Sequence, residues 1–128
     1  MSNIIVFNKK YAVYQQNPDN KLPNLANGDG FWTITYTREE ISVVCEEEWV
    51  PAGVKVEPGW RLMKVKGPLD FSQVGVLSAI AAPLAQVGIS VFTISTYDTD
   101  YILVKDGVLK QAIKSLLRAG HHVEVTLE

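Results

Sequence analysis

The sequence has little cysteine, no cluster of basic residues and no long apolar run, and each shortage excludes a class of protein. Its single cysteine, Cys45, cannot form an internal disulfide, and it leaves no C-x-x-C motif for structural zinc or redox chemistry. Twelve Lys and Arg residues against 14 Asp and Glu residues give a net charge of −2. Because phosphate neutralisation requires clustered positive charge, we expect no nucleic-acid partner.

An uncharged stretch, from Phe71 to Tyr97, raises the question of a membrane span. It contains Ser, Thr and Gln side chains together with Pro83 and Gly88, so it lacks the roughly 20 consecutive apolar residues that a spanning helix needs. The N-terminal residues carry no basic segment ahead of their short apolar run, as a signal peptide would. We therefore expect a cytoplasmic protein with no membrane segment.

What the chain does have is the composition of a folded protein. It is 128 residues long, 47% hydrophobic and 20% charged, which is enough for a core and typical of a globular domain. In the first half, residues 17–30 hold two prolines, two glycines and four asparagines, which predicts a long loop. Around it we expect strands at 11–15, 31–37 and 41–45, and one short helical turn at 46–50.

The second half begins with a predicted strand at 60–66, followed by a helix. Asp70 or Ser72 is expected to cap that helix, because a short side-chain oxygen can accept hydrogen bonds from the N–H groups of a first turn. Pro83 has no N–H for the carbonyl of Ala79 and should kink the helix, which Gly88 ends. Its apolar stripe consists of Leu77, Ile80, Ala81 and Leu84.

Two further strands and a second helix complete this half. Strands are expected at 89–96 and 101–104, joined by a polar turn, and a last strand at 121–127. The helix between the last two of these strands begins after Lys105-Asp106-Gly107 and ends at Gly120. Its apolar stripe consists of Leu109, Ala112, Ile113 and Leu116.

The element order from residue 60 onward is therefore β-α-β-β-α-β. With two right-handed crossovers on an antiparallel sheet, this order predicts an α+β, ferredoxin-like fold. We expect two domains, at residues 1–59 and 60–128. The first, with three strands and little helix, is predicted to be a degraded copy of the second.

Several residues capable of chemistry have ordinary structural interpretations. Cys45 lies in an alternating strand with Ile41 and Val43 on the same face, which is typical of a small buried side chain. His121 and His122 are adjacent in a strand and would point to opposite faces, so they are expected to be a solvated pair rather than metal ligands. No metal site, cofactor or nucleophile–base pair is predicted.

Two places offer more than a structural role. Gly67 to Gly75 leads from a strand end to a helix N-terminus, where N–H groups and the helix dipole favour an anion. Gly75 is expected one turn inside that helix, where it would permit close approach of a ligand. In the turn at 94–100, Asp98 and Asp100 could hold an ammonium or guanidinium group. In each case an ordinary packing glycine or Asp-rich turn remains the alternative.

These places carry a resemblance to a known family. The segments concerned are Gly67-Pro68-Leu69-Asp70-Phe71-Ser72, Gly75-Val76-Leu77, Ala82-Pro83-Leu84-Ala85, Gly88-Ile89-Ser90-Val91-Phe92 and residues 94–104. They resemble the ACT-domain family and are most similar to its CASTOR-type branch, which includes a cytosolic arginine sensor and small bacterial proteins. The resemblance extends to Gly30-Phe31-Trp32 and residues 39–45 in the first half.

The resemblance implies tandem ACT-like units that bind an amino acid between units or subunits and catalyse no reaction. It maps ligand contacts onto Gly75 and onto Thr96, Tyr97 and Asp100. The full set of candidate ligand-binding residues is Ser72, Gly75, Thr96, Tyr97, Asp98 and Asp100.

The sequence thus predicts a non-enzymatic, cytoplasmic, amino-acid-binding regulatory protein. A homodimer is expected, because the edge strands of two ACT-like units could pair, and a regulated protein is a further expected partner. The main alternative is a structural interaction module without a ligand. A third hypothesis, a small enzyme with Asp98 or Asp100 as general base, lacks a nucleophile or cofactor to act with.

Overall fold

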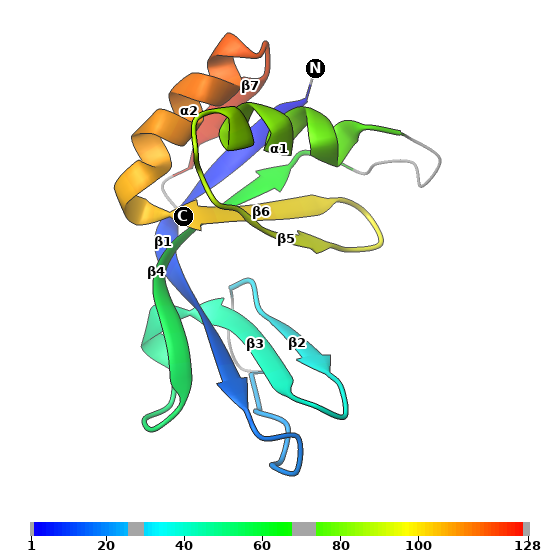
Figure 1. Ribbon diagram of the computed structural model, residues 1–128, viewed down its shortest axis with the longest axis vertical. Helices are drawn as coiled ribbons and strands as arrows, with labels where there is room; N and C mark the ends of the chain where they lie inside the picture. Colours follow the sequence, from blue (N-terminus) through cyan, green and yellow to red (C-terminus); the bar gives the residue numbers. More distant parts are fainter. Residues whose placement is uncertain (1, 26–29, 68–73, 127–128) are drawn as a thin grey trace. The chain divides into compact units, whose positions relative to one another are not determined.

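The computed structural model of the protein describes residues 2–25, 30–67 and 74–126 (Figure 1). These residues form two units. Unit 1 contains the described residues up to Lys9 and those from Trp60 onward, and unit 2 spans Lys10–Gly59. Unit 2 therefore differs from the predicted domain 1–59 in its first residues, because the segment up to Lys9 belongs to unit 1.

Unit 1 holds the predicted order of strands and helices. Two of its strands, β1 and β4, also contribute residues to unit 2. The elements are β1 (Asn3–Gln16), β4 (Lys55–Val65), α1 (Val76–Gln86), β5 (Phe92–Ser95), β6 (Asp100–Lys105), the 3-10 turn η2 (Asp106–Val108), α2 (Leu109–Arg118) and β7 (His122–Val125). Strands β5 and β7 are shorter than predicted, and β4 begins earlier, in a segment expected to be a connection.

The sheet of unit 1 has the strand order β7-β1-β4-β6-β5. Strand β6 is antiparallel to both β4 and β5, as a βαββαβ fold requires. The sheet is not wholly antiparallel, however, because β7 pairs in parallel with the start of β1, Asn3 opposite His122 and Val6 opposite Val125. The α+β, ferredoxin-like element order is confirmed, with β1 as an added strand between β7 and β4.

The core of unit 1 lies between this sheet and its two helices, which cover the same face (Figure 1). Alternate strand residues such as Ile4 and Val6 of β1 pack there, as Met63 and Val65 of β4 do. The two predicted helical stripes are confirmed at every position but Ala81, which is half-buried: Ile80, Leu84, Ala112 and Leu116 are fully buried, and Leu77, Leu109 and Ile113 pack against them.

Both helices end in the same glycine motif. Gly88 and Gly120 adopt positive φ angles of 77° and 94°. The following N–H groups return to the last turn: Ile89 donates to the carbonyl of Leu84 at 3.0 Å, and His121 donates to that of Leu116 at 3.1 Å. The two predicted helix ends are therefore confirmed as Schellman caps.

The start of α1 differs from the prediction. The helix begins at Val76, and its N-cap residue is Gly75, with a φ of 83°. Gly75 thus lies before the helix and not one turn inside it. Asp70 and Ser72 lie outside the described residues and too early in the chain to be the N-cap, so that prediction is wrong.

A histidine compensates for the proline inside α1. The helix continues through Pro83, which leaves the carbonyl of Ala79 without its usual N–H donor. Nε2 of His121 lies 2.9 Å from that oxygen, while Nδ1 accepts the N–H of Ser2 at 3.3 Å. Because Nδ1 is an acceptor, the network places the ring proton on Nε2. His121 is only 3% exposed, so the expected solvated pair is wrong for this residue.

Unit 2 is built from strands and a short 3-10 turn. It contains β2 (Thr33–Tyr36), β3 (Ile41–Glu46) and η1 (Glu47–Trp49), together with the second part of β1 and the first part of β4. β3 is antiparallel to both β1 and β2, and Tyr14, Ile41, Val43 and Cys45 form its buried core. That this unit is a degraded copy of unit 1 stays a prediction.

The hydrogen bond from His121 to the carbonyl of Ala79 predicts that substitutions of His121 and Pro83 have coupled effects on stability. We expect His121→Leu to lower the free energy of unfolding by about 1–3 kcal/mol, because two buried backbone groups lose their partner. In a Pro83→Ala background the substituted residue supplies an N–H to Ala79, so the same change should cost about 1 kcal/mol less. Urea denaturation of the four proteins measures the coupling. His122→Leu, at an exposed position, is the control; equal costs in both backgrounds would contradict the bridge.

Candidate functional site

The candidate site lies at one edge of the unit 1 sheet. Because β4 and β5 are both antiparallel to β6, their carboxyl ends point to the same edge. Tyr101 of β6 is paired with Lys64 on one side and Ile94 on the other. The turn from β5 to β6 therefore lies level with the end of β4, from which the chain leads toward α1.

The β5–β6 turn is closed by its own polar groups. The N–H of Thr96 donates to the carbonyl of Thr99 at 2.8 Å, so Tyr97 and Asp98 form a two-residue tip. The Thr96 hydroxyl donates to the same carbonyl at 3.0 Å and accepts the N–H of Thr99 at 3.3 Å. Of the predicted site residues, Thr96 thus has its side chain committed to the turn.

Thr99 attaches this turn to the neighbouring strand. Its side chain is buried, with 4% of the residue exposed, and its hydroxyl donates to the carbonyl of Val65 at the end of β4. Sequence reasoning missed this role, because a threonine in a polar turn gives no signal that it is buried. The bond fixes the turn beside the end of β4.

The carboxylate of Asp100 is oriented by its strand partner. Ser95 lies directly opposite Asp100, and its hydroxyl donates to Oδ1 of that residue. Asp98 and Tyr97 at the tip are exposed, Tyr97 to 81%. An oriented carboxylate can bind an ammonium or guanidinium group, and an exposed aromatic ring can attract the same cation.

The start of α1 supplies the opposite chemistry. The first helical hydrogen bond runs from Ala79 N–H to the carbonyl of Gly75, at 2.9 Å. The N–H groups of Val76, Leu77 and Ser78 therefore have no acceptor within the helix, and no side chain of the described residues caps them. They are donors for an anion such as a carboxylate.

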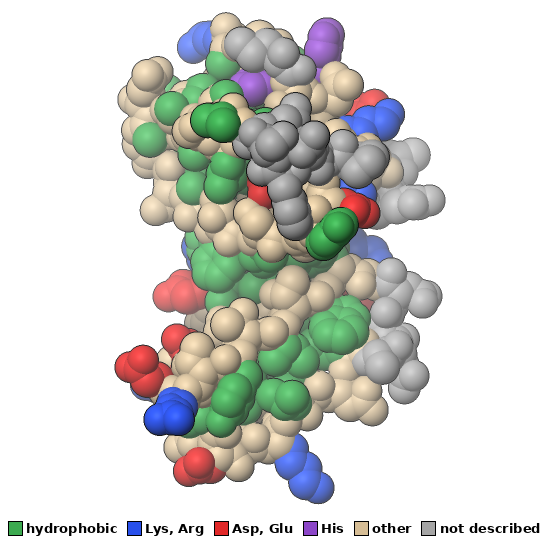
Figure 2. All heavy atoms as spheres, turned by 90° about the vertical axis from the view of Figure 1, so that its right-hand side faces the viewer, with side chains coloured by type: hydrophobic (Ala, Val, Ile, Leu, Met, Phe, Trp, Pro, Cys, Tyr) green, Lys and Arg blue, Asp and Glu red, His purple; other side chains and the backbone are tan. Residues whose placement is uncertain are grey.

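The structure brings these two features to one side of unit 1. Figure 1 shows the first turn of α1 and the β5–β6 turn at the same end of the sheet, and that side faces the viewer in Figure 2, where hydrophobic and acidic side chains are both exposed. Val74, immediately before Gly75, is 96% exposed. Ser72, the remaining predicted site residue, lies outside the described residues.

In the described part of the chain, a reactive thiol, a metal site and a membrane-spanning helix find little or no support. Burial raises the pKa of the Cys45 thiol to about 11, and Glu46 adds to the shift, so Cys45 is protonated at neutral pH. No three His, Cys, Asp or Glu side chains in the described ranges are grouped to hold a metal ion. Within the same ranges, no helix is both long enough and apolar enough to cross a membrane.

Two family models match this chain, and one of them covers the residues at this edge. The family model described as "ACT domain" matches residues 55–118, which include the start of α1 and the β5–β6 turn. A second model, described as an N-terminal domain, matches residues 9–53.

Three similar proteins indicate how far the likeness extends. The cytosolic arginine sensor for mTORC1 subunit 1 of Rattus norvegicus is 38% identical over 60 residues, which are 46% of this chain but only 18% of that protein. A crystal structure of a protein from Agobacterium tumefaciens is 32% identical, covers 99% of this chain and 95% of its own, and has a TM-score of 0.92. The ligand-free regulatory subunit of aspartate kinase from Thermus thermophilus is 9% identical, and the match covers 94% of this chain and 97% of that chain with a TM-score of 0.67. Because the identity is so low, this likeness shows the fold alone.

The backbone conformation of Gly75 predicts that Gly75→Ala is less stable than Gly107→Ala. A Cβ at Gly75 would meet only Ser78 Oγ, at 3.9 Å, and one at Gly107 would meet nothing within 4 Å. Of these two glycines, Gly75 has a positive φ and Gly107 does not. Gly75→Ala should therefore lower the free energy of unfolding by about 1 kcal/mol relative to Gly107→Ala, by backbone strain alone. Thermal and urea unfolding of both variants measure this difference, and equal stabilities would contradict it.

Proposed function

Because this chain belongs to the ACT-domain family, we propose that it is a non-enzymatic regulatory protein that binds an amino acid at the edge described above. One observation carries the proposal: N–H groups of α1 that no described side chain caps and an oriented carboxylate, Asp100, occur at the same sheet edge. An amino acid carries the two matching charges. Binding of both by fixed groups is what a sensor of free amino acids requires.

Each residue has a defined role in this proposal. The α-carboxylate of the ligand accepts hydrogen bonds from the first turn of α1, which begins after Gly75, and Ser72 contributes from the preceding segment. Asp100, with Asp98 beside it, binds the positive group. Tyr97 covers the ligand with its ring, and Thr96 positions the turn through its bonds to Thr99.

The relatives support a regulatory role. One is named as an arginine sensor and another as the regulatory subunit of a kinase. The shared 60 residues span 18% of the sensor, so its ligand and its partner come to this chain only as proposals. We propose accordingly a cytoplasmic protein that needs no cofactor and acts on a protein partner when its ligand binds.

Ligand binding predicts a thermal shift. A ligand that binds only the folded chain raises its stability, by about 2.7 kcal/mol at one hundred times the Kd. A thermal-shift screen of the twenty amino acids should identify the ligand, and calorimetry gives its Kd. Asp100→Ala should then weaken binding by about 1.5–3 kcal/mol, the usual contribution of a hydrogen bond to a charged group.

The control for that variant is Asp19→Ala, at an exposed position of unit 2. It should leave the Kd unchanged. If no amino acid shifts the melting temperature, the interaction module without a ligand is the better interpretation. If a ligand binds Asp100→Ala as tightly as the parent, the site lies elsewhere.

The proposal also includes assembly as a homodimer. Strands β5 and β7 are the two outermost strands of the unit 1 sheet. Each has one side without a strand partner within this sheet, and such strands of two copies can pair. Sedimentation velocity at increasing concentration should show a species of twice the mass of the chain. A monomer at all accessible concentrations would contradict the dimer.

A further inference from the structure

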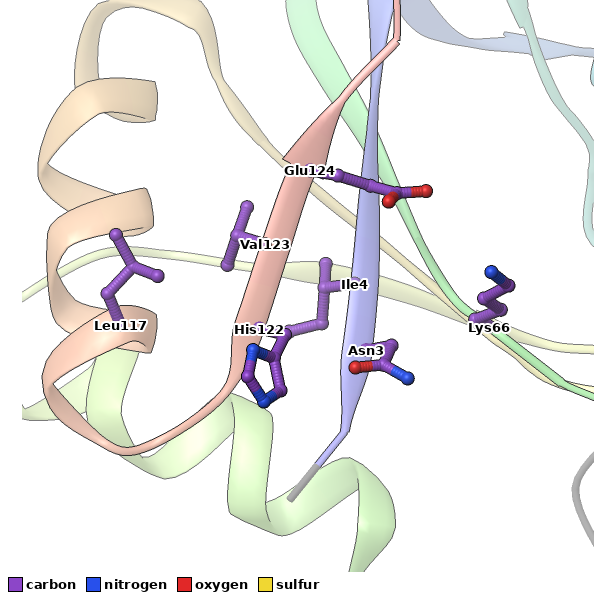
Figure 3. A pocket seen from close by; sticks show the side chains of 7 residues that line it. All are labelled: Asn3, Ile4, Lys66, Leu117, His122, Val123 and Glu124. Atoms are coloured by element: carbon purple, nitrogen blue, oxygen red, sulfur yellow. The ribbon is translucent and has the colours of Figure 1, made fainter.

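A recess on unit 1 begins at the end of β4, where Lys66 follows Val65, and extends from there over β1 and β7. It has a volume of about 470 Å³, within the range of small-molecule pockets. Its lining comes from β7, β1, the end of β4 and the last turn of α2 (Figure 3). None of the candidate site residues lines it. The residues that do are Asn3, Ile4, Lys66, Leu117, His122, Val123 and Glu124.

The polar residues of this recess share one face of the sheet. Ile4, Val123 and Val65 pack into the core beneath the helices. Successive strand residues point to opposite faces, so Asn3, Glu124 and Lys66 point to the face without helices. Figure 3 agrees, because the side chains of Asn3 and Glu124 extend away from α2 toward the side on which Lys66 lies.

The register fixes the spacing of the two charged residues. Lys66 donates its N–H to Asn3 at 2.8 Å, Asn3 lies opposite His122, and Glu124 is two residues further along β7. With strands about 4.8 Å apart and a rise of about 3.3 Å per residue, the Cα atoms of Lys66 and Glu124 are about 12 Å apart. Their side chains therefore present a positive and a negative end separated by the amide of Asn3.

Within the described ranges, neither end is already neutralised. All three side chains are exposed, and neither the Lys66 ammonium nor the Glu124 carboxylate forms an ion pair with another described residue. We propose that this recess binds a small zwitterion whose carboxylate and ammonium groups are several bonds apart, such as an ω-amino acid or a dipeptide. Its carboxylate binds Lys66 and the Asn3 amide, and its ammonium group binds Glu124.

Matched probes test the requirement for two separated charges. We expect 6-aminohexanoate, titrated into the full chain and followed by amide NMR shifts at Asn3, His122 and Glu124, to bind at least tenfold more tightly than hexanoate, hexylamine or glycine. Each of these comparison ligands lacks one charge or the separation, and a hydrogen bond to a charged group is worth about tenfold or more. Equal affinity of hexanoate or hexylamine would overturn the proposal.

Charge-reversal variants test the residues. Lys66→Glu and Glu124→Lys should each weaken binding of 6-aminohexanoate about tenfold, and the double variant should regain affinity with the ligand reversed. Lys110→Glu, exposed on α2, should have no effect. Asp100→Ala should also have none, so failure here and failure of the proposed function are separate results. Single variants that bind like the parent, or a double variant no better than the singles, would contradict the assignment.

Discussion

The arrangement of unit 1 depends on the antiparallel pairing of β6 with both β4 and β5. This pairing makes β4 and β5 parallel to each other, so that the end of β4 and the turn after β5 lie at the same end of the sheet. The bond from Thr99 to the carbonyl of Val65 then holds the turn level with the end of β4. Because of this topology, the N-terminus of α1 and the acidic turn lie at the same end of the sheet (Figure 1), although they are separated in the sequence.

Features that depend on neighbouring residues could be predicted from the sequence. The apolar stripes through Ile80 and Leu84, and through Ala112 and Leu116, follow the helical period, and all four side chains are buried. Gly88 and Gly120 end their helices because the left-handed backbone there favours glycine. The order βαββαβ follows from such local signals, and with it the edge at which Gly75 and Asp100 occur.

Features that depend on residues far apart in the sequence could not be predicted from it. The segment from Asn3 to Val6 joins unit 1 because it pairs with β7, more than a hundred residues later, and no local pattern identifies that partner. The role of His121 depends on Pro83 and Ser2, which leave one carbonyl and one N–H that a single imidazole bridges. The start of α1 differs from the prediction for a related reason: Gly75 adopts a left-handed backbone as the N-cap, and the sequence pattern does not show that conformation.

The hydroxyl groups of the β5–β6 turn hold the turn in place and orient Asp100. Thr96 is bonded within the turn, Thr99 to β4, and Ser95 to Asp100. The two threonine hydroxyls donate to backbone carbonyls, whereas the Ser95 hydroxyl donates to a carboxylate and thereby orients it. The groups left to meet a ligand are backbone N–H donors at one end and carboxylates at the other. In the proposed function, these opposite charges bind the two ends of a zwitterion.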